Sequence, residues 1–292
     1  MKSKILLGYG TYLYNGDSES FTKALDAAYQ SKYDYIDTAK YYQNETEIGI
    51  ALANLRKKYG SSFHFPVQTK VWPDDYLDAR NQVLLSMERL QLKQLDSVLL
   101  HRPSYNLAKD IIAWKDLIQL QKEGLVKQIG VSNYDNEMLF YFEKITNVLP
   151  SVNQIEFNLY NARYDRAITN QRLDVHIQAW RPLTNDIDYL NQDPIVQSLS
   201  EKYQTTPTGI AIAFIKALGM DPIIKSTHPE RIIANAKAFY DVNLSSEDLA
   251  KLKLLNRFYD NRTKYGTSTY TLDQQSLTDL VNEIDMLEKN QK

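Results

Sequence analysis

Four side chains that give and take protons follow strand-like segments of this 292-residue sequence. Asp37, Lys70 and His101 stand at the ends of three successive apolar segments, and Tyr42 follows Asp37 closely. Each residue alone has an ordinary explanation, such as a turn, a solvated charge, packing or a structural histidine. Held together on one face, a carboxylate, ammonium, phenol and imidazole would be costly to desolvate, and such clusters usually persist for function. The pattern therefore predicts a functional site shared by these four residues.

The segments that must position this site recur at a regular spacing. Short apolar segments are centred near Ile36, Val67, Leu99 and Ile129, in steps of 31, 32 and 30 residues. Segments of this length suit strands that are buried on both faces. Four further segments of the same kind are Ile5–Leu7, Val152–Phe157, His176–Ala179 and Ile223–Lys225.

Amphipathic helical patterns lie between these strands. Two of them follow the i, i+3, i+4, i+7 spacing: Phe21, Ala24, Leu25 and Ala28, and then Ile48, Ala51, Leu52 and Leu55. Asn44 with Glu47 predicts an N-cap with a reciprocal acid, and Gly60 and Gly124 stand where C-terminal caps belong. Eight strands, each followed by a helix, indicate parallel βα units.

Two architectures accommodate such units, an open doubly wound sheet and a closed barrel. The dinucleotide fingerprint of the open sheet fails, because Gly8 and Gly10 are followed by Leu13 at the third glycine position. Eight units in just under 300 residues favour a (β/α)8 TIM barrel, with its chemistry at the carboxyl ends of the strands. We expect one domain over residues 1–292, with the barrel at about 4–240 and a C-terminal loop and helices at about 241–292.

Composition excludes several other classes of protein. With 34 Lys and Arg against 36 Asp and Glu, the chain lacks the basic excess of a nucleic-acid binder. It has no cysteine and four scattered histidines, so we expect no disulfide and no metal site. Gly8 interrupts the short apolar start of the chain, and no later apolar stretch is long enough for a membrane span. We expect a cytoplasmic protein with no membrane or nucleic-acid partner.

At the strand ends the sequence resembles the aldo-keto reductases. The likeness runs in order from about Ile5 to Asn235 and is carried by residues 37–45 (DTAKYYQNE), 70–72 (KVW), 99–103 (LLHRP), 130–134 (GVSNY), 153–156 (NQIE) and 225–232 (KSTHPERI). The resemblance implies an enzyme that reduces aldehyde or ketone groups of small molecules to alcohols by hydride transfer from NADPH.

The same resemblance implies a catalytic tetrad of Asp37, Tyr42, Lys70 and His101. A phenol is a weak acid at neutral pH, and a nearby ammonium lowers its pKa. Lys70 would act on Tyr42 in this way while Asp37 orients Lys70, and Tyr42 would be the general acid. His101 would direct the substrate oxygen towards Tyr42.

The family's cofactor-binding positions are also matched. Ser132, Asn133 and Gln154 match the positions that bind the nicotinamide carboxamide, and Trp180 matches the ring-stacking position, where tyrosine is usual. Lys225, Ser226 and Arg231 match the 2′-phosphate site, which favours NADPH over NADH. The remaining expected cofactor residues are Gly10, Thr11, Arg181, Pro182, Leu183, Thr227 and Asn235, and the expected substrate residues are Tyr12, Tyr41, Trp72 and Arg102.

Several features depart from the family pattern. The N-terminal hairpin is short or missing, and Ala234 replaces an acidic or amide residue near the adenine. Arg102 stands where tryptophan is frequent and Arg181 where serine is common, which prompts the hypothesis of an anionic or strongly polar substrate. In the alternative, Arg181 touches the cofactor pyrophosphate and Arg102 pairs with a loop acid.

The tail beyond Phe258 does not follow the family in detail. Leu277, Leu280, Val281, Ile284 and Leu287 form one stripe and predict an added C-terminal helix that packs on its own barrel. Residues 265–270 are expected to form a loop over the pocket.

Two other functions are compatible with a barrel of this kind, an NADPH-binding regulatory or redox-sensing subunit with little turnover and a metal-dependent barrel hydrolase. The intact tetrad argues against the first, and the lack of a ligand cluster disfavours the second. The expected partner is a small carbonyl substrate, and a monomer is favoured.

Overall fold

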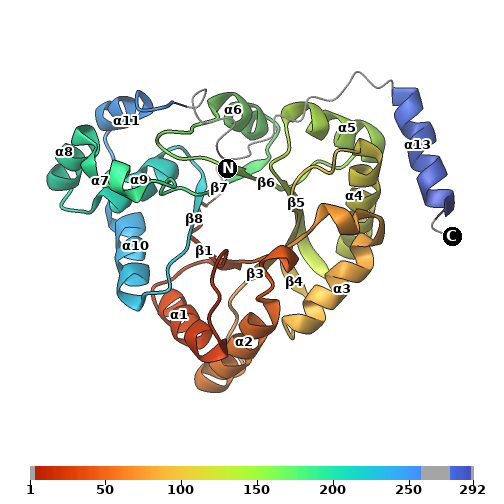
Figure 1. Cartoon of the computed structure of the whole chain (residues 1–292), viewed down its shortest axis with the longest axis horizontal. Coiled ribbons are helices and arrows are strands. Elements are labelled where there is room, and N and C mark those ends of the chain that lie inside the picture. The colour runs from red at the N-terminus through yellow and green to blue at the C-terminus, as the bar shows by residue number, and fades with distance from the viewer. Residues whose placement is uncertain (1–3, 258–276, 291–292) are drawn as a thin grey trace.

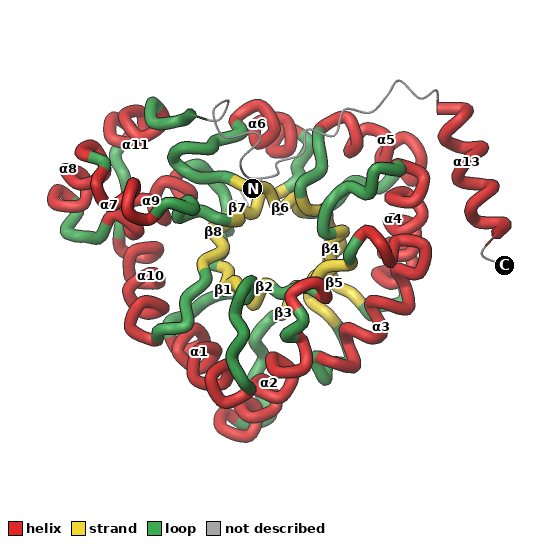
Figure 2. The backbone as a smooth tube through the Cα atoms, in the orientation of Figure 1, coloured by secondary structure: helices red, strands yellow, loops and turns green. Residues whose placement is uncertain are grey.

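The computed structural model describes residues 4–257 and 277–290, and in them eight parallel strands close into a barrel in chain order (Figures 1 and 2). The (β/α)8 prediction is confirmed. The strands are β1 (Gly8–Gly10), β2 (Tyr35–Asp37), β3 (Val67–Val71), β4 (Leu95–Leu100), β5 (Val126–Ser132), β6 (Val152–Glu156), β7 (His176–Trp180) and β8 (Asp221–Ile224). Closure occurs at Gly8, which pairs with Tyr35 of β2 and with Ile223 of β8.

The helices surround this ring of strands (Figure 2). In chain order the described helices are α1 (Ser18–Gln30), η1 (Lys40–Tyr42), α2 (Glu45–Tyr59), η2 (Pro73–Asp78), α3 (Ala79–Arg89), α4 (Leu107–Lys122), α5 (Asn136–Thr146), α6 (Tyr164–Arg172), α7 (Ile187–Gln192), α8 (Pro194–Lys202), α9 (Pro207–Ala217), α10 (Pro229–Asp241), α11 (Ser246–Lys253) and α13 (Leu277–Asn290). Among the described residues, no helix is long and apolar enough to span a membrane.

The predicted strand segments lie in or overlap the observed strands except at the start of the chain. There β1 begins at Gly8, so the assignment of a strand to Ile5–Leu7 is wrong. The reason is that carboxylate side chains accept the backbone N–H hydrogen bonds that the carbonyl groups of a neighbouring strand would otherwise accept. Leu6 N–H donates to Asp221 Oδ1 at 2.7 Å, and Leu7 N–H donates to Asp34 Oδ2 at 2.9 Å. No strand precedes β1 within the described residues 4–7.

The helical patterns bury the faces that were predicted. The apolar stripe of α1 (Phe21, Ala24, Leu25 and Ala28) and that of α2 (Ile48, Ala51, Leu52 and Leu55) are buried in the core. Each fully buried leucine, isoleucine or phenylalanine side chain contributes about 1.5–3 kcal/mol relative to an exposed one. Gly60 and Gly124 adopt φ of 88° and 76° at the ends of their helices, as C-terminal caps do.

Asn44 occupies the N-cap of α2 as predicted, but the reciprocal cap with Glu47 is wrong. The Asn44 side chain makes no capping bond. Its Oδ1 accepts from the Thr38 hydroxyl at 2.8 Å, and its Nδ2 donates to the Thr11 carbonyl at 3.0 Å. Asn44 therefore joins the loops that follow β1 and β2, beneath the candidate site.

The C-terminal helix α13 packs against α4, as predicted from its apolar stripe. Leu280 and Ile284 are buried there. At the edges of this contact, Asn106 Nδ2 donates to Glu283 Oε1 at 2.7 Å, and Lys115 Nζ lies 2.6 Å from Glu288 Oε1. The loop predicted at residues 265–270 lies outside the described residues.

Candidate active site

A pocket of about 580 Å³ lies at the carboxyl ends of the strands. Most of the residues predicted for the site line it. They are Gly10, Tyr12, Asp37, Tyr41, Tyr42, Trp72, His101, Arg102, Ser132, Asn133, Gln154, Trp180, Arg181, Pro182, Leu183 and Lys225.

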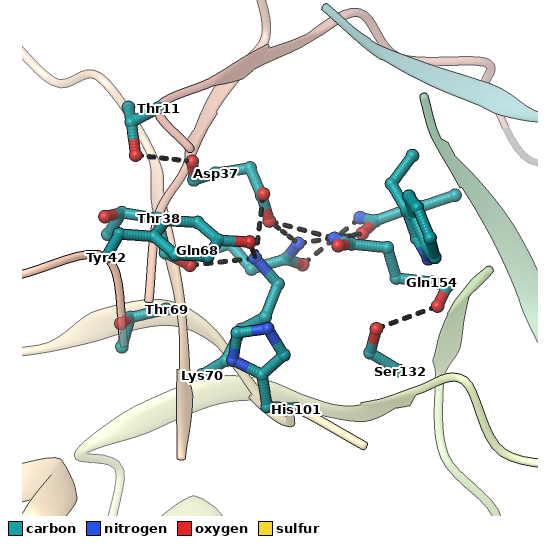
Figure 3. Close-up of polar contacts among 12 residues, drawn as sticks. Thr11, Asp37, Thr38, Tyr42, Gln68, Thr69, Lys70, His101, Ser132 and Gln154 are labelled. Carbon is teal, nitrogen blue, oxygen red and sulfur yellow. Dashed lines mark hydrogen bonds and ion pairs between the residues drawn. The ribbon is translucent and has the colours of Figure 1, made fainter. Parts of the chain in front are cut away.

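Lys70 lies at the base of this pocket, within hydrogen-bond distance of both Asp37 and Tyr42 (Figure 3). Its side chain is fully buried, and Nζ lies 2.8 Å from Asp37 Oδ2, 3.1 Å from Tyr42 Oη and 2.9 Å from the Thr38 carbonyl. Burial lowers the pKa of Lys70, but Asp37 and Tyr42 raise it by more, so its pKa lies above the usual value. Lys70 is therefore an ammonium in direct contact with the Tyr42 phenol at neutral pH.

Two glutamine side chains hold the other oxygen of Asp37. Asp37 Oδ1 accepts from Gln68 Nε2 at 2.8 Å and from Gln154 Nε2 at 2.9 Å (Figure 3). Both amides also donate to Gln178 Oε1, at 2.7 and 3.0 Å. Gln68 and Gln178 are not among the site residues predicted from the sequence. The alternation of side chains in a strand could have found Gln68, because it lies two residues before Lys70 on β3 and shares its face.

Tyr42 stands on η1, just after β2. Burial raises the pKa of Tyr42 above its usual value, although Lys70 lowers it in part. The expected effect of Lys70 is thus present but smaller than the effect of desolvation. Because the phenol stays protonated across the neutral range, Tyr42 can act as a proton donor.

His101 stands at the end of β4 beside Tyr42 and Trp72. Its ring lies edge-on to both, with centroids 5.6 and 5.0 Å away. Burial, Lys70 and Arg102 all hold the pKa of His101 well below its usual value. The imidazole is therefore neutral, with one N–H to donate.

Side chains at the ends of β5, β6 and β7 are linked to one another. The Trp180 indole Nε1 donates to Asn133 Oδ1 at 2.9 Å, and the Ser132 hydroxyl donates to the Gln154 carbonyl at 2.9 Å. Asn133 has a φ of 65°, which turns the chain sharply after β5. These bonds fix the plane of the indole along one wall of the pocket.

The N-terminus of α10 offers a site for an anion. Its N-cap, His228, makes no capping bond through its side chain, so the positive end of the helix dipole is available to a ligand. Lys225 and Arg231 are exposed on either side, and the buried Ser226 hydroxyl accepts from His228 N–H at 3.1 Å.

Three other predicted cofactor residues lie outside the pocket lining. Thr11 is buried and donates its hydroxyl to the Asp37 carbonyl at 3.0 Å. Asn235 is buried on α10, and although burial raises the pKa of Tyr33, Asn235 lowers that pKa in part. Thr227 is exposed next to Ser226.

Aromatic rings form the outer wall of the pocket, where the substrate residues were predicted. The rings of Tyr41 and Trp72 stack with their centroids 4.1 Å apart, and the ring centroids of Tyr12 and Tyr42 are 5.0 Å apart. The Arg102 guanidinium lies 4.9 Å above the Trp72 ring. Further lining residues, which the sequence reasoning missed, are Leu13, Thr184, Asn185 and Ile187. They stand in the loops after β1 and β7 or just beyond, where no motif marks them.

Within the described residues, no group of three or more His, Asp or Glu side chains is placed to hold a metal ion. Two histidines outside the site pair with aspartates. His64 Nε2 lies 3.1 Å from Asp96 Oδ1, and His176 Nε2 lies 2.8 Å from Asp221 Oδ1.

A closed parallel barrel with proton-transfer groups at the carboxyl ends of its strands has the architecture of a TIM-barrel enzyme. The chain belongs to the aldo/keto reductase family, whose model matches residues 6–257. It is 32% identical over 251 residues to methylglyoxal reductase DkgA of Escherichia coli (strain K12), covering 86% of this chain and 89% of that protein. It is 31% identical over 252 residues to glyoxal reductase of Bacillus subtilis (strain 168), and the match covers 86% of this chain and 88% of that protein.

Solved structures of family members have the same fold. An aldo-keto reductase, AKR2E5, complexed with NADPH superposes with a TM-score of 0.80 at 27% identity, over 93% of this chain and 91% of that one. MGS-M4, an aldo-keto reductase enzyme from a Medee basin deep-sea metagenome library, superposes with a TM-score of 0.79 at 27% identity, over 86% and 91%.

Proposed function

We propose that this protein reduces aldehyde or ketone groups of small molecules to alcohols, with NADPH as the hydride donor and Tyr42 as the general acid. The observation that carries the proposal is the buried Lys70 ammonium, which contacts the Asp37 carboxylate and the Tyr42 hydroxyl at the base of the pocket. Relatives named methylglyoxal reductase and glyoxal reductase support a small carbonyl substrate. The NADPH complex of a similar structure supports the cofactor.

The residues around the pocket fit this cofactor. The uncapped N-terminus of α10, with Lys225, Ser226 and Arg231, would hold the 2′-phosphate. Ser132, Asn133 and Gln154 would bind the carboxamide, and the indole of Trp180 would stack on the nicotinamide ring. The remaining residues assigned to the cofactor are Gly10, Thr11, Arg181, Pro182, Leu183, Thr227 and Asn235. When bound, NADPH would supply the hydride that no side chain can provide.

The chain's own residues would manage the proton. As negative charge develops on the substrate oxygen, Tyr42 donates its hydroxyl proton to that oxygen. The Lys70 ammonium at 3.1 Å stabilises the phenolate that remains, and Asp37 keeps Lys70 charged and in place. The neutral His101 donates an N–H to the same oxygen and so directs it towards Tyr42. Tyr12, Tyr41, Trp72 and Arg102 would surround the rest of the substrate.

Replacing Tyr42 by phenylalanine tests the general acid. We expect Y42F to lower kcat/KM for methylglyoxal by about 10²–10⁴-fold, since positioned proton transfer contributes that much. NADPH oxidation measures turnover, and quenching of tryptophan fluorescence measures cofactor binding, which should persist. Tyr29→Phe removes a phenol hydroxyl outside the pocket and should leave both unchanged.

Full activity in Y42F would show that another group is the acid. If the wild type quenches with NADPH but reduces none of a panel of aldehydes and diketones, the protein is an NADPH-binding regulatory subunit and the proposal is wrong.

A further inference from the structure

Arg102 lies at the rim of the pocket on the face of an aromatic stack. Its guanidinium is 4.9 Å above the Trp72 ring, and Trp72 stacks in turn on Tyr41. The Trp72 ring also lies 5.0 Å from the His101 ring. One indole thus contacts both the guanidinium and the imidazole that faces the reacting oxygen.

The backbone of Arg102 is held in place from below. The Tyr76 hydroxyl, on the fully buried Tyr76 of η2, donates to the Arg102 carbonyl at 2.6 Å and accepts from the Arg102 N–H at 3.4 Å. Tyr134 lies behind it, with the two hydroxyls 3.5 Å apart. Because its backbone is fixed by buried groups, Arg102 presents its side chain at a defined place on the rim.

The two arginines of the pocket differ in their charged neighbours. Burial raises the pKa of Glu156 to about 7 even though the nearby Arg181 guanidinium lowers it in part, so Arg181 has an acid beside it. Arg102 makes no ion pair with any acid in residues 4–257 or 277–290. Asp37, the one acid among the described lining residues, is neutralised by Lys70. The pocket therefore presents an unmatched positive charge at Arg102.

We propose that Arg102 is a specificity-determining residue that binds a carboxylate on the carbonyl substrate, so that the preferred substrates are oxo acids. A guanidinium binds a carboxylate through two parallel hydrogen bonds. The Trp72 indole beneath the Arg102 guanidinium shields one face of that guanidinium from water. Because the Trp72 indole contacts both the Arg102 guanidinium and the His101 ring, the carboxylate would lie several bonds from the reacting carbonyl. The inference rests on the proposed function and deepens it. The carboxylate stays unchanged while the carbonyl carbon takes the hydride and its oxygen takes the Tyr42 proton.

The experiment compares one acid with its uncharged ester. Succinate semialdehyde and its methyl ester share the aldehyde and the chain length, and NADPH oxidation gives kcat/KM for each. We expect Arg102→Leu to lower kcat/KM for the acid by about ten- to a hundredfold, the value of a charge-assisted hydrogen bond. The ester should change by less than about threefold. Arg102→Lys keeps the charge without the planar fork and should lose part of the acid's advantage.

Lys109→Gln is the matched control for charge alone. It removes a positive charge from the first turn of α4, outside the pocket lining. We expect it to leave the acid-to-ester ratio unchanged. Equal losses for acid and ester in Arg102→Leu, or the same ratio change in Lys109→Gln, would overturn the subsite.

A second measurement does not depend on turnover. Titration with succinate should change tryptophan emission saturably in the wild type and bind at least tenfold more weakly in Arg102→Leu. If no carbonyl compound is reduced but succinate binds through Arg102, the proposed function fails and the subsite stands. If methylglyoxal is reduced but succinate binding is unaffected by Arg102→Leu, the subsite fails and the proposed function stands. Inorganic phosphate whose binding is weakened more than that of succinate by Arg102→Leu would overturn the assignment of a carboxylate.

Discussion

Lys70 and Asp37 depend on each other because both are buried. The Lys70 side chain is fully buried and that of Asp37 is 5% exposed, with 2.8 Å between Nζ and Oδ2. Removal of one partner leaves a desolvated charge, whereas removal of both leaves neutral groups. A single and a double variant can therefore distinguish the contribution of the pair to the free energy of unfolding from its contribution to proton transfer.

Urea unfolding of the wild type and two variants measures the contribution of the pair to stability. We expect Lys70→Met to lower the free energy of unfolding by about 3–5 kcal/mol, because Asp37 then lacks a counter-ion. The double variant Lys70→Met/Asp37→Asn should recover most of that loss, since no charge remains buried. Reductase activity should stay lost in both, because neither has an ammonium beside Tyr42. A double variant no more stable than Lys70→Met would show that the loss has another cause.

Arg231 allows the choice of cofactor to be tested in isolation. It is exposed beside the uncapped N-terminus of α10, so its removal should not disturb the core. We expect Arg231→Ala to raise the Kd of NADPH by about ten- to a hundredfold and that of NADH by less than threefold. Fluorescence quenching measures both. Lys237→Ala, further along the exposed face of α10, is the control, and equal weakening of the two cofactors by Arg231→Ala would contradict the 2′-phosphate role.

At the residue scale, the sequence predicted which side chains meet in the pocket, but it did not predict the pKa values of those side chains. Asp37, Tyr42, Lys70 and His101 were predicted together because their motifs mark successive strand ends. The rise in the pKa of Tyr42 could not be predicted, since it depends on how completely neighbouring side chains exclude water. Gln68 and Gln178 were missed because an inward-facing glutamine has no motif.

At the scale of elements, a buried polar chain joins three loops of the pocket. Asp110, in the first turn of α4, accepts from Ser104 N–H with both carboxylate oxygens, at 3.0 and 3.2 Å, and the Tyr134 hydroxyl lies close enough to lower its pKa. Tyr134 follows β5, and its neighbour Tyr76 holds Arg102 after β4. Burial raises the pKa of Asp110 to about 7, although these hydrogen bonds lower it in part.

This shift makes stability depend on pH. The folded pKa lies above the unfolded value near 3.9, so the folded state binds more protons between the two, and its stability falls as pH rises through that window. Asp110→Asn keeps an acceptor for Ser104 and cannot ionise. We therefore expect the unfolding free energy of the variant, relative to wild type, to rise by about 2–3 kcal/mol between pH 5 and pH 8.

Urea unfolding at the two pH values checks this prediction. Asp26→Asn is the control, since hydrogen bonds and the charge of Lys58 lower the pKa of Asp26 despite its partial burial, so it is ionised throughout this range. Parallel pH curves for Asp110→Asn and wild type would contradict the assignment.

Element boundaries were predicted where local chemistry decides them. Gly60 and Gly124 end helices because only a residue that tolerates positive φ fits there. The start of β1 and the role of the Asn44 side chain were predicted wrongly because distant partners decide them. Asp221 is far along the chain from Leu6, and no local pattern reveals it.

At the scale of the whole molecule, eight strand segments in just under 300 residues and the failed dinucleotide fingerprint together predicted a closed barrel over an open sheet. Eight parallel units leave no free sheet edge once β1 pairs with both β2 and β8. α13 adds an outer layer on one side, beside α4 (Figure 1). α13 contacts the pocket only indirectly, because it packs on α4 and none of its described residues lines the pocket.

This arrangement predicts that α13 contributes to stability and has little effect on turnover. Leu280→Ala and Ile284→Ala each remove a buried side chain, so each should cost about 2–5 kcal/mol and lower Tm. Together they should cost less than their sum, because the loss ends once α13 no longer packs on α4. Val281→Ala, at a position 39% exposed, should change stability by less than about 0.5 kcal/mol. Thermal unfolding gives the stabilities, and kcat/KM below the lowest Tm should stay within threefold of wild type. A large fall in kcat/KM at unchanged Tm would mean instead that α13 acts on the pocket directly.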